Sequence, residues 1–160
     1  MKKTLFFISL MLSVLFFASK NKNEQPASKM NNTVTNRDTS KVAQDSSFLD
    51  EAAQGGMMMV QLGEVAEKKP NNKDVQGFAK MMINDHSKIN VELKDLVQKN
   101  NINLSVSLSN NKQDKINDHE KLSGRKFDKQ YVDMIAEDHK NDVAKFKDES
   151  QNASSPEVRQ

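Results

Sequence analysis

The sequence predicts an all-α protein, an antiparallel helical bundle whose last helix is truncated. Two observations lead to this fold class. Apolar residues recur at alternating steps of three and four over long stretches, which is the period of an amphipathic helix and not of a strand. Clusters of Asn, Ser, Gly and Pro separate these stretches. With 160 residues, the chain is long enough for one such domain.

The first 19 residues predict a secretory signal peptide. Lys2 and Lys3 precede an apolar run at residues 5–17, and Ala18 and Ser19 supply small residues after it. The run is shorter than the roughly 20 residues that a membrane-spanning helix needs. We therefore expect export to the periplasm or cell envelope. An association with the outer membrane and an uncleaved N-terminal anchor remain open.

Residues 20–44 predict a disordered linker, because they are polar and contain few apolar side chains. The helical domain is then expected over residues 45–160. Lys and Arg total 24 and Asp and Glu total 22, and removing Lys2 and Lys3 leaves 22 of each. This balance argues against a nucleic-acid partner, which requires a basic face. Membrane association is expected only through the N-terminal segment, if it stays uncleaved.

The first predicted helix begins at Ser47, which suits a helix cap, and ends before Pro70. Its apolar stripe follows one face: Phe48, Ala52, Gly55, Met59, Leu62 and Ala66. Glycine inside a helix costs roughly 1 kcal/mol relative to alanine. We therefore expect close approach to a neighbouring helix at Gly55, Gly56 and Gly63.

Three further helices are expected. The second carries the most regular stripe: Val75, Ala79, Met82, His86, Ile89, Leu93 and Leu96. A short polar helix is capped by Ser109 and ends near Leu122, with Ser123 and Gly124 as its stop. The fourth extends from about Lys126 to Ser150, and its stripe comprises Val132, Ile135, His139, Val143 and Phe146.

The last residues have the pattern of another helix start. Ser155 suits the cap, Pro156 the first helical position and Glu157 the first turn. The sequence stops within two turns of this start, and three long amphipathic helices do not close a four-helix core. Two interpretations follow: a segment of the bundle is missing, or a second copy of the chain or a partner helix completes it.

Five segments resemble a bacterial family, domain of unknown function 4142: residues 48–57 (FLDEAAQGGM), 60–63 (VQLG), 78–88 (FAKMMINDHSK), 127–131 (FDKQY) and 137–146 (EDHKNDVAKF). The resemblance extends in register over about residues 45–160. It implies an exported, ferritin-like helical bundle of unsettled activity, often labelled an outer-membrane protein. Two departures stand out. Met59 occupies the position of the family's first-helix Glu, and the family's final His-bearing helix is missing here.

Two histidines are the main candidate metal ligands. His86 and His139 each lie on the apolar stripe of a long helix, where helical bundles place inward-facing ligands. Imidazole is the commonest metal-binding side chain. Asp85 and Asp138 precede them in the sequence and are candidates to join or tune the site. Neighbouring residues on a helix point about 100° apart, however, so these carboxylates need not face inward with the rings.

Two methionines extend this hypothesis. Met59 is expected to face the same interior, and Met82 lies one turn from His86. Thioethers beside imidazoles favour copper over iron, and zinc and iron remain alternatives. A di-iron centre is not expected, because no Glu stands three residues before a His. In the competing interpretation the methionines fill the core, and both imidazole rings form hydrogen bonds with carboxylates such as Asp142.

The absence of Cys excludes disulfides, thiolate zinc sites and iron–sulfur clusters, and no Gly-x-Ser-x-Gly element or phosphate-binding loop is present. The sequence therefore favours binding over catalysis. The first hypothesis is a non-enzymatic, exported bundle that binds a metal ion through His86 and His139. The second is a structural or interaction module that pairs with another copy or a partner helix. A redox enzyme using the same metal is the third.

Overall fold

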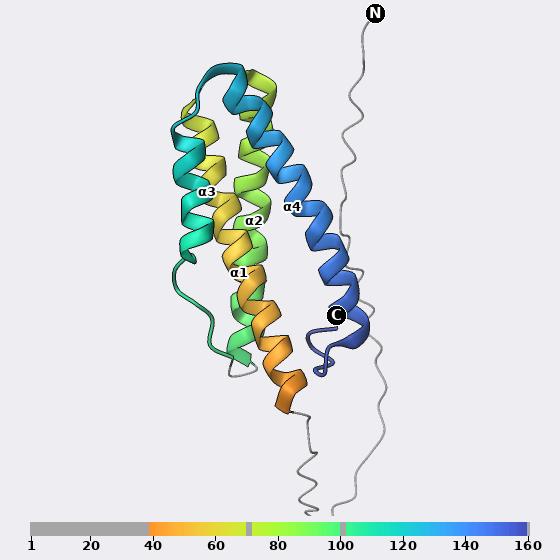
Figure 1. Ribbon diagram of the computed structural model, residues 1–160. Helices are drawn as coiled ribbons and strands as arrows, with labels where there is room; N and C mark the ends of the chain where they lie inside the picture. Colours follow the sequence, from red (N-terminus) through yellow and green to blue (C-terminus); the bar gives the residue numbers. More distant parts are fainter. Residues whose placement is uncertain (1–38, 70–71, 100–101, 160) are drawn as a thin grey trace, which may run out of the picture. The chain divides into compact units, whose positions relative to one another are not determined.

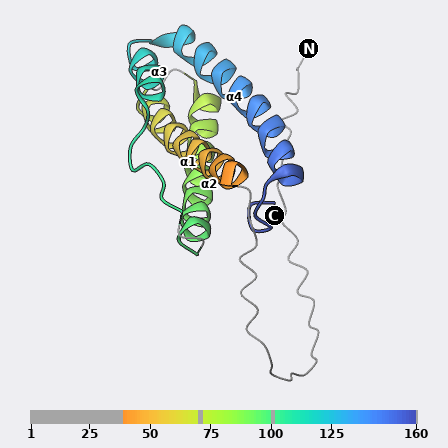
Figure 2. The same cartoon turned by 60° about the horizontal axis from the view of Figure 1, so that its bottom comes forward.

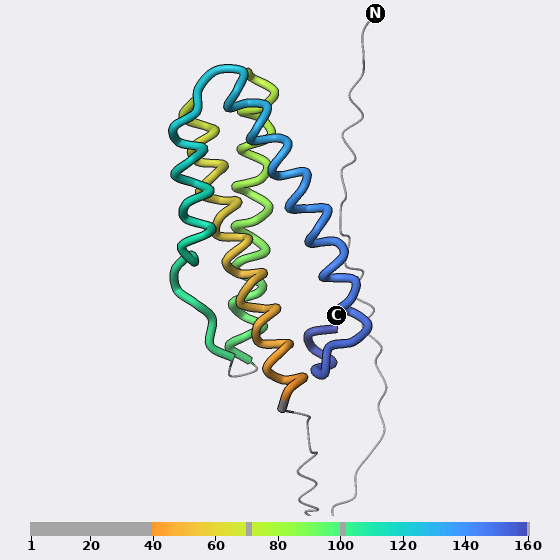
Figure 3. Tube along the Cα trace, viewed as in Figure 1, coloured from red at the N-terminus to blue at the C-terminus, as the bar shows by residue number. Residues whose placement is uncertain are grey.

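A computed structural model describes residues 39–69, 72–99 and 102–159 of the chain. Four helices make up this part: α1 (Thr39–Lys68), α2 (Lys73–Lys99), α3 (Asn110–Glu120) and α4 (Gly124–Asn152). Successive helices run in opposite directions (Figure 1), and the Cα trace in Figure 3 follows the same path. No strand occurs among the described residues. The all-α helical bundle is thereby confirmed.

The N-terminal boundary of the domain differs from the expected one. α1 begins at Thr39, so residues 39–44 of the expected linker are helical and the boundary at 45 was placed too late. Tertiary contacts extend the helix: Asp45 is buried, and Gln44 Nε2 donates a hydrogen bond to Glu149 of α4 over 3.4 Å. The expected signal peptide and the rest of the linker lie outside the described residues. None of the described helices is both long enough and apolar enough to cross a membrane.

The other helix ends agree closely with expectation. Ser109 is the N-cap of α3, and α3 ends at Glu120. Gly124 has a φ of +60°, a left-handed conformation that glycine adopts without strain, so the chain can turn directly from α3 into α4. Beyond α4, Ser155 O accepts hydrogen bonds from Val158 N (3.1 Å) and Arg159 N (3.2 Å). The expected helix start at Ser155 is therefore present as a single turn.

The core forms where α1 and α2 pack closely against each other. A β-carbon added to Gly63 would lie 2.6 Å from Ile83 Cγ1 and 3.2 Å from the carbonyl oxygen of Ala79. One added to Gly56 would overlap with the side chain of Asn90. Close approach is thus confirmed at Gly56 and Gly63. It is wrong for Gly55, where a β-carbon would have no neighbour within 4 Å.

An aromatic group joins α4 to this core. The fully buried rings of Phe127 and Tyr131 stack with centroids 5.7 Å apart, and Phe78 of α2 meets Tyr131 edge-on at 6.1 Å. Lys69 Nζ lies 5.3 Å from the Phe127 ring centroid and donates hydrogen bonds to the carbonyl oxygens of Glu120 and Leu122. These contacts fix the start of α4 against the end of α1.

The buried hydroxyl of Tyr131 leads to a prediction. It has no hydrogen-bond partner, and burial raises the pKa of the phenol well above its usual value. Because removing an unpaired buried polar group removes only a desolvation cost, we expect Tyr131→Phe to leave stability unchanged or raise it by about 1 kcal/mol. Urea unfolding of both proteins measures this. A loss above about 1 kcal/mol would show that the hydroxyl is bonded in solution.

The two ends of the domain are joined by a buried carboxylate. Asp45 is 4% exposed and accepts hydrogen bonds from Ser154 N (3.0 Å), Ser154 Oγ (2.6 Å) and Ser155 N (2.9 Å). Backbone and hydroxyl donors thus satisfy a charge that would otherwise be costly to bury. The segment after α4 is held against the first turns of α1 as a result.

The predicted stripes of α2 and α4 are buried over only part of their length. α4 diverges from α2 along its course, as Figures 1 and 2 show from two directions. Ile89 is consequently 48% exposed, Val143 55% and Phe146 50%, although all three lie on the predicted apolar stripes. Phe146 still touches Phe48 of α1, with ring centroids 5.0 Å apart. Each stripe therefore contains apolar residues that are about half exposed.

Candidate functional site

α2 and α4 bring the two predicted histidines together. The ring centroids of His86 and His139 are 5.4 Å apart, and the ring planes are inclined at 84°. The regular stripe of each helix places its His in line with buried residues, Met82 on α2 and Ile135 on α4. The pair lies between the packed start of α4 and the region where α4 leaves α2, and both rings are half-buried.

Backbone bonding selects the tautomer of His139. Its Nδ1 lies 2.8 Å from the carbonyl oxygen of Ile135, which can only accept a hydrogen bond. The neutral ring therefore carries its proton on Nδ1 and leaves a lone pair on Nε2. Metal-binding histidines commonly have this arrangement, because a bond from the second nitrogen orients the ring.

His86 is held in its neutral form. Burial, and after it the charge of His139, lower its pKa from 6.5 to about 4, while the charge of Asp85 opposes the shift. Its Nδ1 is buried without a hydrogen-bond partner. Among the described residues, no carboxylate forms a hydrogen bond with either ring, so the expected pairing with Asp142 is not found. A neutral His86 beside a His139 whose Nδ1 bonds a backbone carbonyl is an arrangement that can bind a metal ion.

The spacing of the rings agrees with shared coordination. Zn–N bonds are about 2.0–2.1 Å long, which places a coordinated ring centroid about 3.2 Å from the ion. Two such rings at a tetrahedral angle have centroids about 5.2 Å apart. The observed separation of 5.4 Å is compatible with one shared ion, and it is also the ordinary spacing of an edge-to-face contact between two rings.

The other predicted ligands do not form a group with the two rings. Asp85 is exposed, and Asp138 forms an ion pair with Lys115 of α3 at 3.6 Å. Met59 and Met82 are buried in the apolar core. In the part of the chain that the structure describes, no three His, Asp or Glu side chains form a group able to hold a metal ion. The structure thus brings together the two histidines and does not gather the full set.

Two polar residues near the histidines were not among the predicted ligands. Asn90, one turn after His86, has a buried Oδ1 without a hydrogen-bond partner. Asp142, one turn after His139, has its pKa raised by burial and then by the charge of Asp138. Helical spacing from each His was the available signal for both. It could not show that their surroundings are buried, because that depends on how α1 and α4 pack.

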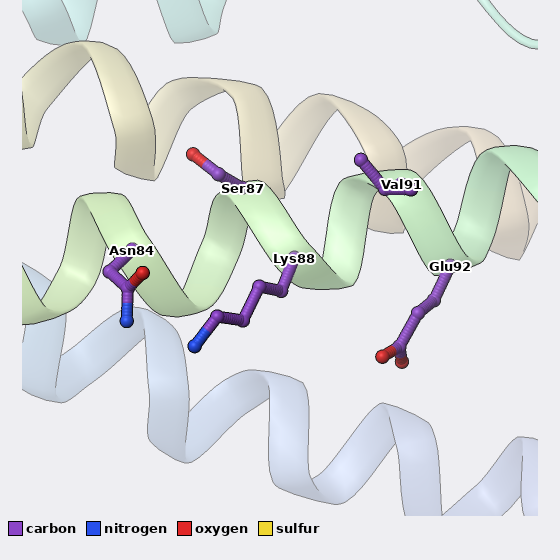
Figure 4. Close-up of a pocket in the computed structure, with 5 residues that line it drawn as sticks. All are labelled: Asn84, Ser87, Lys88, Val91 and Glu92. Atoms are coloured by element: carbon purple, nitrogen blue, oxygen red, sulfur yellow. The ribbon is translucent and has the colours of Figure 1, made fainter.

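A shallow, open surface hollow does not coincide with the histidine pair. Its lining residues all come from α2: Asn84, Ser87, Lys88, Val91 and Glu92. In Figure 4 these side chains extend from both edges of one helix and do not converge on a common point. A hollow lined by a single helix face encloses no ligand, so the histidine pair remains the candidate site.

Comparison with known proteins identifies the family but not an activity. The family model described as "Domain of unknown function (DUF4142)" matches residues 30–160. No curated protein and no solved structure gave a significant match. The match covers all four helices, the histidine pair and the segment after α4. The chain therefore belongs to the DUF4142 family.

Proposed function

We propose that this protein is an exported helical bundle of the cell envelope that binds a transition-metal ion through His86 and His139. The observation that carries the proposal is that α2 and α4 bring the two ring centroids to 5.4 Å, a spacing compatible with one shared tetrahedral ion. The positively charged and then apolar N-terminal sequence supports export.

The state of the two rings supports metal binding as well. Protons compete with metal ions for imidazole nitrogen, so a pKa of about 4 leaves His86 ready to bind at neutral pH. His139 Nδ1 donates a hydrogen bond to the Ile135 carbonyl oxygen, which leaves Nε2 as the nitrogen that can coordinate a metal ion. His86 thus needs no deprotonation before it binds an ion at neutral pH.

The donor set favours Zn²⁺ or Cu²⁺. Imidazole nitrogens suit both ions, whereas iron sites in helical bundles require several inward carboxylates. The argument from sequence for copper relied on Met59 and Met82, which are buried among apolar side chains. Without thioether ligands, zinc and divalent copper are the two metals to test.

The test is metal uptake by the purified full chain, measured by mass spectrometry and titration with ZnCl₂ or CuCl₂. We expect uptake that His86→Ala/His139→Ala abolishes and each single variant weakens at least about tenfold. His119→Ala is the matched control, since His119 Nδ1 also bonds a carbonyl four residues earlier, that of Lys115, at 2.8 Å. Equal uptake by the double variant and the unmodified chain, or no uptake at all, would contradict the proposal.

A second candidate function is an interaction module that completes its bundle with another copy or a partner helix. The half-exposed apolar side chains of Ile89, Val143 and Phe146 favour it, because soluble helices rarely leave such a row uncovered. Metal content separates the two functions: an interaction module remains metal-free, and the double histidine variant does not affect its assembly.

A further inference from the structure

One ring nitrogen of the candidate site lacks a hydrogen-bond partner. All three histidines of the chain lie on helices, and Nδ1 of His119 and of His139 lies 2.8 Å from the carbonyl oxygen four residues earlier. His86 does not share this arrangement, because its Nδ1 is buried and has no partner. The orientation of the His86 ring is therefore not fixed by a hydrogen bond at Nδ1.

Metal binding makes this gap costly. Nδ1 of His86 is enclosed by protein atoms, which leaves Nε2 as the nitrogen that can coordinate an ion shared with His139. A neutral imidazole that coordinates through Nε2 carries its proton on Nδ1 and is a hydrogen-bond donor there. A buried N–H group without an acceptor is unfavourable, and metal-binding histidines almost always donate this proton to a nearby acceptor. His86 thus requires an acceptor close to Nδ1.

Asn90 supplies an unused acceptor one turn later on α2. Its Oδ1 is buried and has no hydrogen-bond partner. Residues four apart on a helix are neighbours, with β-carbons about 5–6 Å apart. Helical side chains point back toward the N-terminus, so the amide of Asn90 extends over the turn that carries His86. A rotation of the Asn90 side chain can therefore bring Oδ1 within hydrogen-bonding distance of His86 Nδ1.

The carboxylates near His86 are less suited to this role. Asp85 is exposed, and its Oδ1 accepts a hydrogen bond from Asn84 Nδ2 over 3.4 Å. Adjacent residues point about 100° apart around a helix, which directs the Asp85 carboxylate away from a buried ring atom. On α4, Asp138 has one buried oxygen without a partner, but its other oxygen pairs with Lys115, so this carboxylate faces α3. The amide one turn after the ring is the better acceptor.

The packing of α1 against α2 keeps the Asn90 amide beside this turn. A β-carbon added to Gly56 of α1 would overlap with the amide, so the amide occupies the space that a side chain at position 56 would fill. An apolar side chain at position 90 could use the same space without leaving a buried oxygen unpaired. Packing alone therefore does not explain an amide at this position.

We propose that Asn90 positions His86 for metal binding, with Asn90 Oδ1 accepting a hydrogen bond from His86 Nδ1 while His86 Nε2 coordinates the ion. Asn90 does not touch the ion and acts through the ring. His139 already has the equivalent bond, to the Ile135 carbonyl oxygen. This inference rests on the proposed metal-binding function. It adds to that function a residue that fixes the tautomer and the orientation of His86.

The first experiment is titration of the purified full chain with ZnCl₂. Asn90→Leu replaces the amide by an apolar side chain, and we expect zinc binding to weaken at least about tenfold, as is usual when such a partner is removed. Asn90→Asp keeps an acceptor and has no N–H donor, so it should bind zinc at least as tightly as the unmodified chain. Asn84→Leu is the matched control, because Asn84 is exposed on the same helix (Figure 4), and it should leave the affinity unchanged.

The second experiment observes the hydrogen bond itself by NMR of the imidazole groups in the zinc-loaded proteins. The Nδ1 proton of His86 should exchange slowly with water in the unmodified chain. In Asn90→Asp its signal should move to lower field, because a carboxylate accepts a stronger hydrogen bond than an amide. In Asn90→Leu the proton should exchange faster. A residue that only fills space would not change this signal in Asn90→Asp.

The outcomes distinguish this inference from the function on which it rests. If Asn90→Leu binds zinc as tightly as the unmodified chain, or if Asn90→Asp loses as much affinity as Asn90→Leu, Asn90 does not position the ring. Metal binding by His86 and His139 is retained in that case. A chain that takes up no zinc overturns both. If Asn90→Leu does not fold, an unchanged Nδ1 proton signal in Asn90→Asp overturns the inference.

Discussion

Gly63→Ala is expected to lower the free energy of unfolding by about 2 kcal/mol, whereas Gly55→Ala raises it by about 1 kcal/mol. The new methyl group at position 63 would lie 2.6 Å from Ile83 Cγ1 and 3.2 Å from a backbone oxygen, so α1 and α2 would have to move apart. At position 55 it would meet nothing within 4 Å, and the higher helix propensity of alanine remains as a gain.

Urea unfolding followed by circular dichroism measures this difference of about 3 kcal/mol between the two variants. Both substitutions add the same methyl group to the same helix, so intrinsic helix propensity cancels in the comparison. Equal stabilities would show that α1 and α2 are farther apart at Gly63 than the structure has them. The result bears on function because the α1–α2 pair is the base on which α4 positions its histidine.

Lowering the pH is expected to reduce the free energy of unfolding of the metal-free protein, because His86 is buried. The ring takes up a proton near pH 6.5 in the unfolded chain but only near pH 4 in the folded chain. Between these values the unfolded state binds more protons, so the free energy of unfolding falls as the pH is lowered from 6.5 to 4. The full shift corresponds to about 3 kcal/mol, and water around the partly exposed ring reduces this to about 2 kcal/mol.

The measurement is a series of urea unfolding curves between pH 7 and pH 4 in the presence of a chelator. The free energy of unfolding of His86→Gln should lack the part of the pH dependence that comes from His86. The His119→Gln variant should retain that part. Comparing variants removes the contribution of Asp142, whose raised pKa acts in the opposite direction. If His86→Gln shows the same pH dependence as the unmodified protein, the ring is not held neutral by burial.

The fold was largely predictable because the apolar periodicity is strong. The buried stripe from Val75 to Met82 and the stop at Gly124 depend on local spacing and local backbone conformation, and both are confirmed. Ser109 occupies the predicted N-cap position of α3, although its side chain makes no capping hydrogen bond. The start of α1 was not predictable in this way. Residues 39–44 contain little apolar sequence, and the buried bonds of Asp45 to a segment more than 100 residues away stabilise that turn.

The candidate site was predictable in its two central residues and not in the rest. Helical spacing placed His86 and His139 on inward stripes, and they do meet. Spacing could not assign Asp138 to Lys115 of α3, because that ion pair depends on the path of a different helix. Nor could it reveal that Ile89 and Val143 are exposed, since a stripe shows which face is apolar and not how far a neighbouring helix follows it.

The buried carboxylate that joins the ends of the domain also affects the order of folding. Asp45 bonds Ser154 and Ser155 across 109 and 110 positions of sequence, whereas α1 ends at Lys68 and α2 begins at Lys73. Closing so large a loop costs more chain entropy than closing a helical hairpin, so it follows the local contacts. We expect the hairpin of α1 and α2 to form first. The hydrogen bonds between Asp45 and the segment after α4 should form late. The histidine pair, which needs α4 in place, is then assembled only as folding nears completion.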